Sequence, residues 1–175
     1  MSEYPNELIR KRHLPDGTEV TIRPIRPEDS VMEQEFARHL SEDSRYCRFM
    51  GHVAELPEKK LRYFTDVDYE RHMALVATVA RDGKELEIGV ARYVATAQPN
   101  SCEFAVTVDD AWQGTGIAGL LMLALIDSAR AHGYRTMEGK VLRTNFKMLK
   151  FARQLGFVAR RDPEDGDTVT VVKPL

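Results

Sequence analysis

The sequence predicts a mixed α/β (α+β) protein with one domain, in which helices flank a mostly antiparallel sheet. Three alternating segments joined by short turns run from residue 73 to 108, and such short connections imply antiparallel neighbours. Segments with helical spacing of apolar residues precede and follow them. The 175 residues are 43% hydrophobic and 30% charged, without a Pro/Gly/Ser-rich linker, which is typical of a single globular domain.

The N-terminal third is predicted to contain a strand followed by two helices. Residues 19–25 alternate as a strand does, after the turn residues Asp16-Gly17. Pro27-Glu28-Asp29 opens the first helix, because proline suits a first turn and acids suit its positive end. Pro57-Glu58 opens the second helix, whose apolar residues are spaced to bury one side.

The remaining chain is predicted to continue with strands and two further helices, the longer of which ends at Gly133 in the manner of a C-cap. The predicted strands are 73–80, 86–96, 102–108, 135–142, 157–161 and 168–172, and the predicted helices are 116–132 and 145–155. The order is therefore β-α-α-β-β-β-α-β-α-β-β, with the whole of 1–175 in one domain. We expect residues 1–13 to be a polar leader whose cluster Arg10-Lys11-Arg12-His13 is a solvated face.

Composition excludes several classes of protein. The net charge is −2, so bulk electrostatics favour neither nucleic acid nor an anionic membrane as a partner. The two cysteines, Cys47 and Cys102, form no metal-binding spacing and no disulfide framework. No signal peptide and no apolar run long enough for a membrane span are visible. These features predict a cytoplasmic protein without a metal.

The most informative segment is the loop that leads from the strand at 102–108 into the helix at 116–132. Its residues run Gln113, Gly114, Thr115, Gly116, Ile117, Ala118 and Gly119. Small residues at a helix start leave backbone N–H groups free and let a phosphate approach the backbone closely. The dipole of the helix also favours an anion there. The segment therefore predicts a pyrophosphate-binding loop.

The same glycines match a dinucleotide fingerprint, in which Glu138 takes the place of the ribose-binding acid. That fingerprint opens a parallel βαβαβ unit. Here an antiparallel meander precedes the loop, and only 56 residues follow Gly119. The dinucleotide interpretation is therefore rejected.

These motifs resemble the GNAT superfamily of N-acetyltransferases. Gln113 to Ala118 looks like the family's Q/R-x-x-G-x-G/A signature, and the segment Asn145 to Phe157 is similar to a later family motif. The N-terminal half narrows the match. Segments 15–18, 22–29, 40–46 and 66–69 look like the acetyltransferase domain of bacterial protein-lysine acetyltransferases, and this resemblance covers roughly residues 14–160.

The resemblance implies a fold and a chemistry. In the family, the strands on either side of the loop and its helix splay apart, and the pantetheine arm of acetyl-CoA fills the gap. Backbone groups of Val106 and Val108 would pair with that arm, residues 113–119 would hold the pyrophosphate, and Asn145 would contact the coenzyme, unless it is only an N-cap. A backbone N–H would polarise the thioester oxygen.

Glu103 is the candidate general base. A lysine-like amine has a pKa of about 10.4 and is mostly protonated at neutral pH. A carboxylate near the thioester can take its proton, directly or through a water. The alternative is that Glu103 is a solvent-facing strand residue. Many family members place a tyrosine where this sequence has Ala152, so no general acid for the thiolate is evident. Asp66, Asp68, Tyr69 and His72 fit either an acceptor wall or ordinary turn chemistry.

The sequence thus predicts an enzyme that moves an acetyl group from acetyl-CoA onto a primary amine, with a protein lysine as the leading acceptor. Two alternatives stay open: an acetyltransferase for a small amine or amino-acid-like acceptor, and a coenzyme-A-binding module that has lost catalysis. A homodimer is compatible with the sequence.

Overall fold

A computed structural model describes residues 2–41, 56–161 and 164–175. They form a sheet of eight strands in the order β1-β2-β3-β4-β5-β6-β8-β7, in which every neighbouring pair is antiparallel except β5 and β6. The strands are β1 (Arg10–His13), β2 (Glu19–Pro24), β3 (His72–Arg81), β4 (Lys84–Ala95), β5 (Ser101–Val108), β6 (Thr136–Leu142), β7 (Val158–Arg161) and β8 (Thr168–Pro174).

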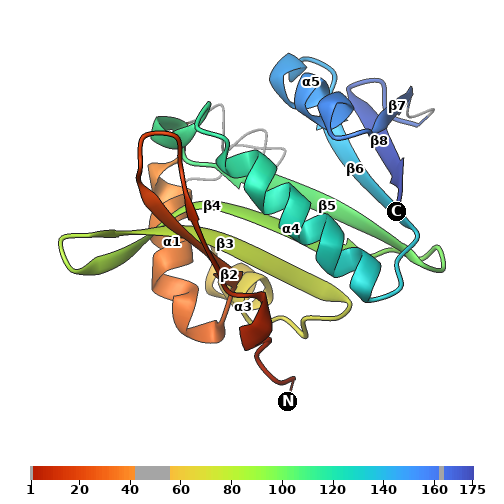
Figure 1. Ribbon diagram of the computed structural model, residues 1–175. Coiled ribbons are helices and arrows are strands. Elements are labelled where there is room, and N and C mark those ends of the chain that lie inside the picture. The colour runs from red at the N-terminus through yellow and green to blue at the C-terminus, as the bar shows by residue number, and fades with distance from the viewer. Residues whose placement is uncertain (1, 42–55, 162–163) are drawn as a thin grey trace.

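Helices cover both faces of this sheet (Figure 1). The helix α4 packs on β3, β4 and β5, whereas α1 lies against β4 on the opposite face together with α3. The helices are α1 (Ser30–His39), α3 (Glu58–Thr65), α4 (Ile117–Ala131) and α5 (Phe146–Gln154), with short 3-10 turns η1 (Asn6–Leu8), η2 (Pro27–Asp29) and η3 (Asp110–Trp112). Among the residues that the structure describes, the predicted mixed fold and its order of elements are confirmed from residue 19 onward.

The strand β1 was not predicted. Residues 10–13 pair antiparallel with β2, although the sequence suggested only a polar leader. All four side chains are exposed, as expected for the basic cluster. An edge strand of this kind is held by backbone hydrogen bonds and buries no face, so it carries no alternating apolar signal.

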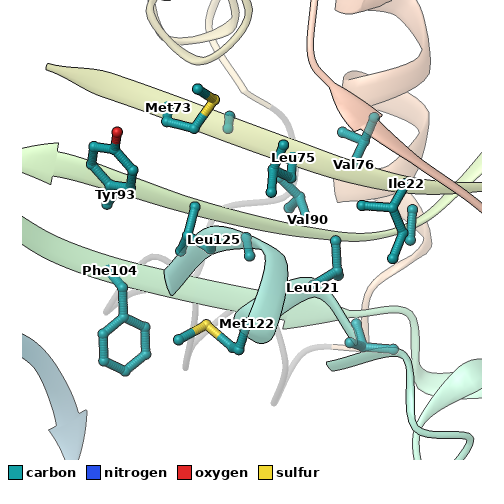
Figure 2. Packing of buried hydrophobic residues seen from close by; sticks show 14 of the residues in the cluster. Ile22, Met73, Leu75, Val76, Val90, Tyr93, Phe104, Leu121, Met122 and Leu125 are labelled. Atoms are coloured by element: carbon teal, nitrogen blue, oxygen red, sulfur yellow. The ribbon is translucent and has the colours of Figure 1, made fainter. Parts of the chain in front are cut away.

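The main core lies between α4 and the sheet (Figure 2). Leu121 and Leu125 are fully buried against strand residues such as Leu75 and Tyr93. A Cβ at Gly89 would lie 3.1 Å from Leu121 Cδ1, so the missing side chain lets α4 approach β4 closely.

The opposite face is anchored by charged groups. Arg23 on β2 forms two hydrogen bonds with Asp29, at 2.8 and 2.9 Å, and its guanidinium also bonds Glu85 at 2.8 Å. Asp29 stands directly before α1, so this bidentate pair ties the start of the helix to the sheet. The side chains of Arg23 and Asp29 are nearly inaccessible to water, which makes the loss of either partner costly.

Candidate active site

The strands β5 and β6 part soon after they begin to pair. Their register joins Ser101 to Thr136, Cys102 to Met137 and Glu103 to Glu138, and the pairing ends there. Beyond that point, β5 stays paired with β4 and β6 stays paired with β8 (Figure 1). The sheet is therefore splayed between the two strands, as the family resemblance implied.

A phenylalanine ring separates the two strands. Phe104 follows the last paired residue of β5, and its ring lies against the backbone of β6 at Gly139. A Cβ added to Gly139 would fall 2.5 Å from Phe104 Cε1, so the ring occupies the space of the missing side chain. The ring also packs on Phe157, with the two centroids 4.9 Å apart. This aromatic contact joins the two halves of the sheet below the gap.

The backbone of β5 faces the gap at alternate residues. The carbonyl of Ser101 accepts the N–H of Thr96 on the β4 side, whereas the carbonyl of Asn100 accepts the N–H of Thr136 on the β6 side. Because peptide groups alternate along a strand, those of Val106 and Val108 point toward the gap. The carbonyl of Val108 also accepts a bond from Gln113 Nε2 at 3.3 Å.

The predicted phosphate loop follows β5 and the short turn η3, and it leads into α4. Gly114 and Gly116 have φ angles of +79° and +95°, a left-handed conformation that glycine adopts without strain. A Cβ at Gly114, Gly116 or Gly119 would meet nothing within 4 Å. Gly116 is the N-cap of α4 and supplies no side-chain cap, so the first N–H groups of the helix are available to an anion.

The other loop residues hold the loop in shape. Gln113 bonds back to β5, and the hydroxyl of Thr115 donates to the carbonyl of Trp112. Ile117 is buried, which leaves only its backbone to face a ligand, and Ala118 is partly exposed. Asn145 is the N-cap of α5, where its Oδ1 accepts the N–H of Met148 at 3.2 Å.

Glu103 occupies the last paired position of β5, on the sheet face opposite α4. Its neighbours in register are Val94 on β4 and Glu138 on β6. Partial burial raises the pKa of the Glu103 carboxyl; the nearby Lys140 ammonium opposes this rise, and the charge of Glu138 adds to it. A carboxyl with a raised pKa retains a proton more readily, which suits a general base that must work near neutral pH.

A buried charged cluster lies behind α1 and α3 on the same face. Arg92 is nearly inaccessible, and its Nη1 donates to the carbonyl of Phe64 at 3.1 Å and lies 2.9 Å from His72 Nε2. Its Nη2 lies 3.7 Å from Glu33. Burial and the charge of Glu33 raise the pKa of Glu87 well above that of an ordinary glutamate. Sequence reasoning missed this cluster, because an alternating strand does not reveal which charged residues it buries.

Several remaining candidates have structural roles. Asp68 Oδ1 accepts the N–H groups of Glu70, Arg71 and His72, which is turn chemistry. The Tyr69 hydroxyl donates to the carbonyl of Ile25, and burial raises its pKa to about 12. Cys102 is a buried free thiol.

Groups that could replace the missing tyrosine are few among the described residues. Ala152 is buried within α5. Tyr63 is half exposed on α3 and packs on His72, with ring centroids 5.0 Å apart. Tyr46 and Cys47 lie outside the described residues.

Three further observations concern a surface concavity, metal binding and membrane spans. A concavity of about 1350 Å³ lies between the N-terminal residues and α4. Asp68 and Tyr69 line it, but Glu103 and the glycine loop do not. In the same residues, no group of three His, Cys, Asp or Glu side chains is arranged to hold a metal ion. None of the helices described is long and apolar enough to cross a membrane.

Comparison with known proteins agrees with this geometry. The profile of the acetyltransferase (GNAT) family matches residues 34–157. An acetyltransferase of Pseudomonas aeruginosa is 42% identical over 156 residues, which cover 89% of this chain and 84% of that protein. The acetyltransferase Pat of Mycolicibacterium smegmatis is 34% identical over 81% of this chain, which spans only 42% of Pat.

A solved structure shares the arrangement of the whole chain. The GNAT domain of S. lividans PAT superposes with a TM-score of 0.89 at 31% identity, covering 99% of this chain and 100% of that domain. The matched region 34–157 includes β5, the glycine loop, α4, β6 and α5, and it ends before β7. The parted strands and the loop between them therefore belong to a fold shared with these acetyltransferases, and the chain is a member of the GNAT acetyltransferase family.

Proposed function

We propose that this acetyltransferase moves the acetyl group of acetyl-CoA onto the side chain of a protein lysine, with Glu103 as the general base. One observation carries the proposal. The β5–β6 pairing ends at a half-buried carboxylate, and from there β5 runs along the gap into a glycine loop at a helix start. A carboxylate, an unpaired strand edge and an uncapped helix start thus follow one another along residues 103–119, which supports the proposal.

The residues fit the coenzyme. Open space at Gly114, Gly116 and Gly119 and the uncapped N-terminus of α4 suit a pyrophosphate. Peptide groups of Val106 and Val108 face the gap, where they would pair with the amides of the pantetheine arm. The free amide nitrogen of Asn145 would lie beside the coenzyme, since its side-chain oxygen caps α5. Bound acetyl-CoA would supply the thioester.

Glu103 would make the amine reactive. An ammonium group has no lone pair, so a lysine side chain must lose a proton before it attacks a carbonyl carbon. The raised pKa of Glu103 improves its ability to accept that proton. A backbone N–H on the gap side of β5 would donate to the thioester oxygen and stabilise the negative charge that develops there.

Support for a protein acceptor comes from similarity. Roughly residues 14–160 resemble the acetyltransferase domain of protein-lysine acetyltransferases, and the solved S. lividans domain is similar over the whole chain. The absence of a tyrosine at Ala152 is compatible with one alternative, a module that binds coenzyme A without turnover.

An acceptor comparison tests the proposal. Thiol release from acetyl-CoA would be followed with folded proteins, lysine peptides, free lysine and polyamines at equal amine concentration. A folded substrate should have the highest kcat/KM, because contacts remote from the lysine contribute binding energy. Equal turnover of a free amine would overturn the protein-lysine acceptor. Coenzyme binding without thiol release for any acceptor would indicate the inactive module.

A further inference from the structure

Two carboxylates stand side by side where the sheet splits. Glu103 and Glu138 are partners in the short parallel pairing of β5 and β6. Registered residues on neighbouring strands direct their side chains to the same face of the sheet. Both side chains are partly buried. They lie on the face opposite α4, because the adjacent Phe104 and Met137 belong to the core that packs on α4 and side chains alternate along a strand. Glu138 is the residue that the rejected dinucleotide motif had assigned to a ribose.

This pairing is unfavourable unless a cation is present. Like charges opposite one another destabilise a sheet, and partial burial weakens the solvent screening that would relieve the repulsion. Among residues 2–41, 56–161 and 164–175, neither carboxylate takes part in a hydrogen bond or a close ion pair. Lys140 on β6 is exposed and forms no close ion pair with either acid in this part of the chain, but its charge lowers the pKa of Glu103 and partly offsets the effect of burial.

We propose that Glu138 is a positioning residue of the acceptor site, which together with Glu103 holds the incoming amine in its ammonium form. The proposal rests on the proposed function, because it takes Glu103 as the base beside the thioester. Three N–H donors of a primary ammonium can serve both carboxylates at once. The pair therefore selects a cationic primary amine and disfavours neutral amines and hydroxyl acceptors.

The proton balance agrees with two carboxylates of unequal roles. Forming the amide removes two protons from the ammonium group. One goes to Glu103, which later returns it to water, and the other ends on the departing thiol. Glu138 transfers no proton in this scheme; it orients the nitrogen and favours the charged form of the substrate.

Substitution at Glu138 tests this role. With Glu138→Gln, KM for the amine should rise about tenfold or more, the loss expected for one charge-assisted hydrogen bond. KM for acetyl-CoA should stay unchanged. Without like-charge repulsion, the melting temperature of the free protein should be equal or higher. A Glu138→Gln protein with an unchanged amine KM would overturn the proposal.

The pH profile gives a readout that a merely structural role would not change. The charged groups facing Glu103 across the strands are Glu138 and Lys140 on β6; Val94 on β4 is apolar, and His72 lies one strand further. Glu138→Gln should move the acidic limb of kcat/KM to lower pH. Lys140→Gln, the matched control on the same strand, should move it to higher pH. The free amine titrates identically in every assay, so these displacements report the enzyme.

The outcomes separate this inference from the proposed function. Suppose that Glu103→Gln is inactive while Glu138→Gln keeps the wild-type amine KM and the wild-type acidic limb of the pH profile. The assignment of Glu103 as the base is then supported, and the positioning role of Glu138 is refuted. If Glu103→Gln has full activity, the base assignment falls, and the proposed role of Glu138 falls with it. A rise in the KM for acetyl-CoA alone would place Glu138 on the coenzyme side and overturn an acceptor role.

Discussion

The surroundings of Glu103 shift the pKa of its carboxyl away from that of an ordinary glutamate. An exposed glutamate titrates near pH 4.3 and would be a weak base for an ammonium ion. Burial at the last paired position of β5 raises the pKa of Glu103, while Lys140 restrains the rise. A fully exposed glutamate would lack both influences. The properties of this proposed base are therefore set by where the β5–β6 pairing ends.

Replacing the base should separate catalysis from binding. Glu103→Gln keeps the shape of the side chain and removes its capacity to accept a proton, so turnover should fall by roughly 10²–10⁴. The increase in melting temperature caused by coenzyme A should persist. Asp127→Asn on the exposed face of α4 is the control, and its turnover should match the wild type. Full activity of Glu103→Gln would mean that another group takes the proton.

Among the elements, the junction of β5 and α4 is the most constrained. Gly116 has a φ angle of +95°, so any side chain there strains the backbone as well as filling the loop. Gly119 lies within the first turn of the helix, and a Cβ there meets nothing. A side chain introduced at position 119 would therefore fill the proposed phosphate space without straining the backbone.

Substitution at Gly119 tests the coenzyme site. Gly119→Asp should raise the stability of the free protein by up to about 1 kcal/mol, because aspartate favours the helix over glycine and its charge suits the N-terminus. The same charge should repel a pyrophosphate and abolish the melting-temperature increase caused by coenzyme A. Gly119→Ala should be intermediate. An undiminished increase in Gly119→Asp would exclude this turn from the coenzyme site.

At the scale of the molecule, the two faces of the sheet differ in character. The α4 face is an apolar core, whereas the α1 and α3 face encloses two groups of charges. Arg23 is bonded to both Asp29 and Glu85, and its hydrogen bond lowers the pKa of Glu85. Glu87 in the other group has no hydrogen-bond partner for its carboxyl oxygens. The two glutamates should therefore affect stability with opposite dependence on pH.

The pH dependence of unfolding tests this contrast. Glu87 has a raised pKa, so the folded protein holds a proton that the unfolded chain releases above pH 4.5, and stability falls as pH rises toward the folded pKa. Glu87→Gln should melt at least about 2 °C higher than wild type at pH 8, with a smaller difference at pH 5. If the wild type melted at a higher temperature than Glu87→Gln, by a margin that grows with pH, the raised pKa of Glu87 would be refuted.

Glu85→Gln should show the opposite trend. The lowered pKa of Glu85 contributes stability above the unfolded pKa, and this contribution is lost as pH falls through the folded pKa. The variant should therefore be less stable than wild type at pH 7, and the difference should shrink in acid. Thermal unfolding of both variants over the same buffers provides the comparison.

The sequence alone determined the order of elements from residue 19 and the glycine loop before α4, because apolar periodicity, turn residues and helix caps are local signals. The resemblance to the GNAT family added the prediction that the strands on either side of the glycine loop and α4 splay apart. Only the tertiary structure decided that residues 10–13 form an edge strand, that Glu87 is buried, and that Glu103 stands beside Glu138. Each of these depends on which strands pair and in what register, and a parallel register between residues 35 positions apart leaves no local pattern in the chain.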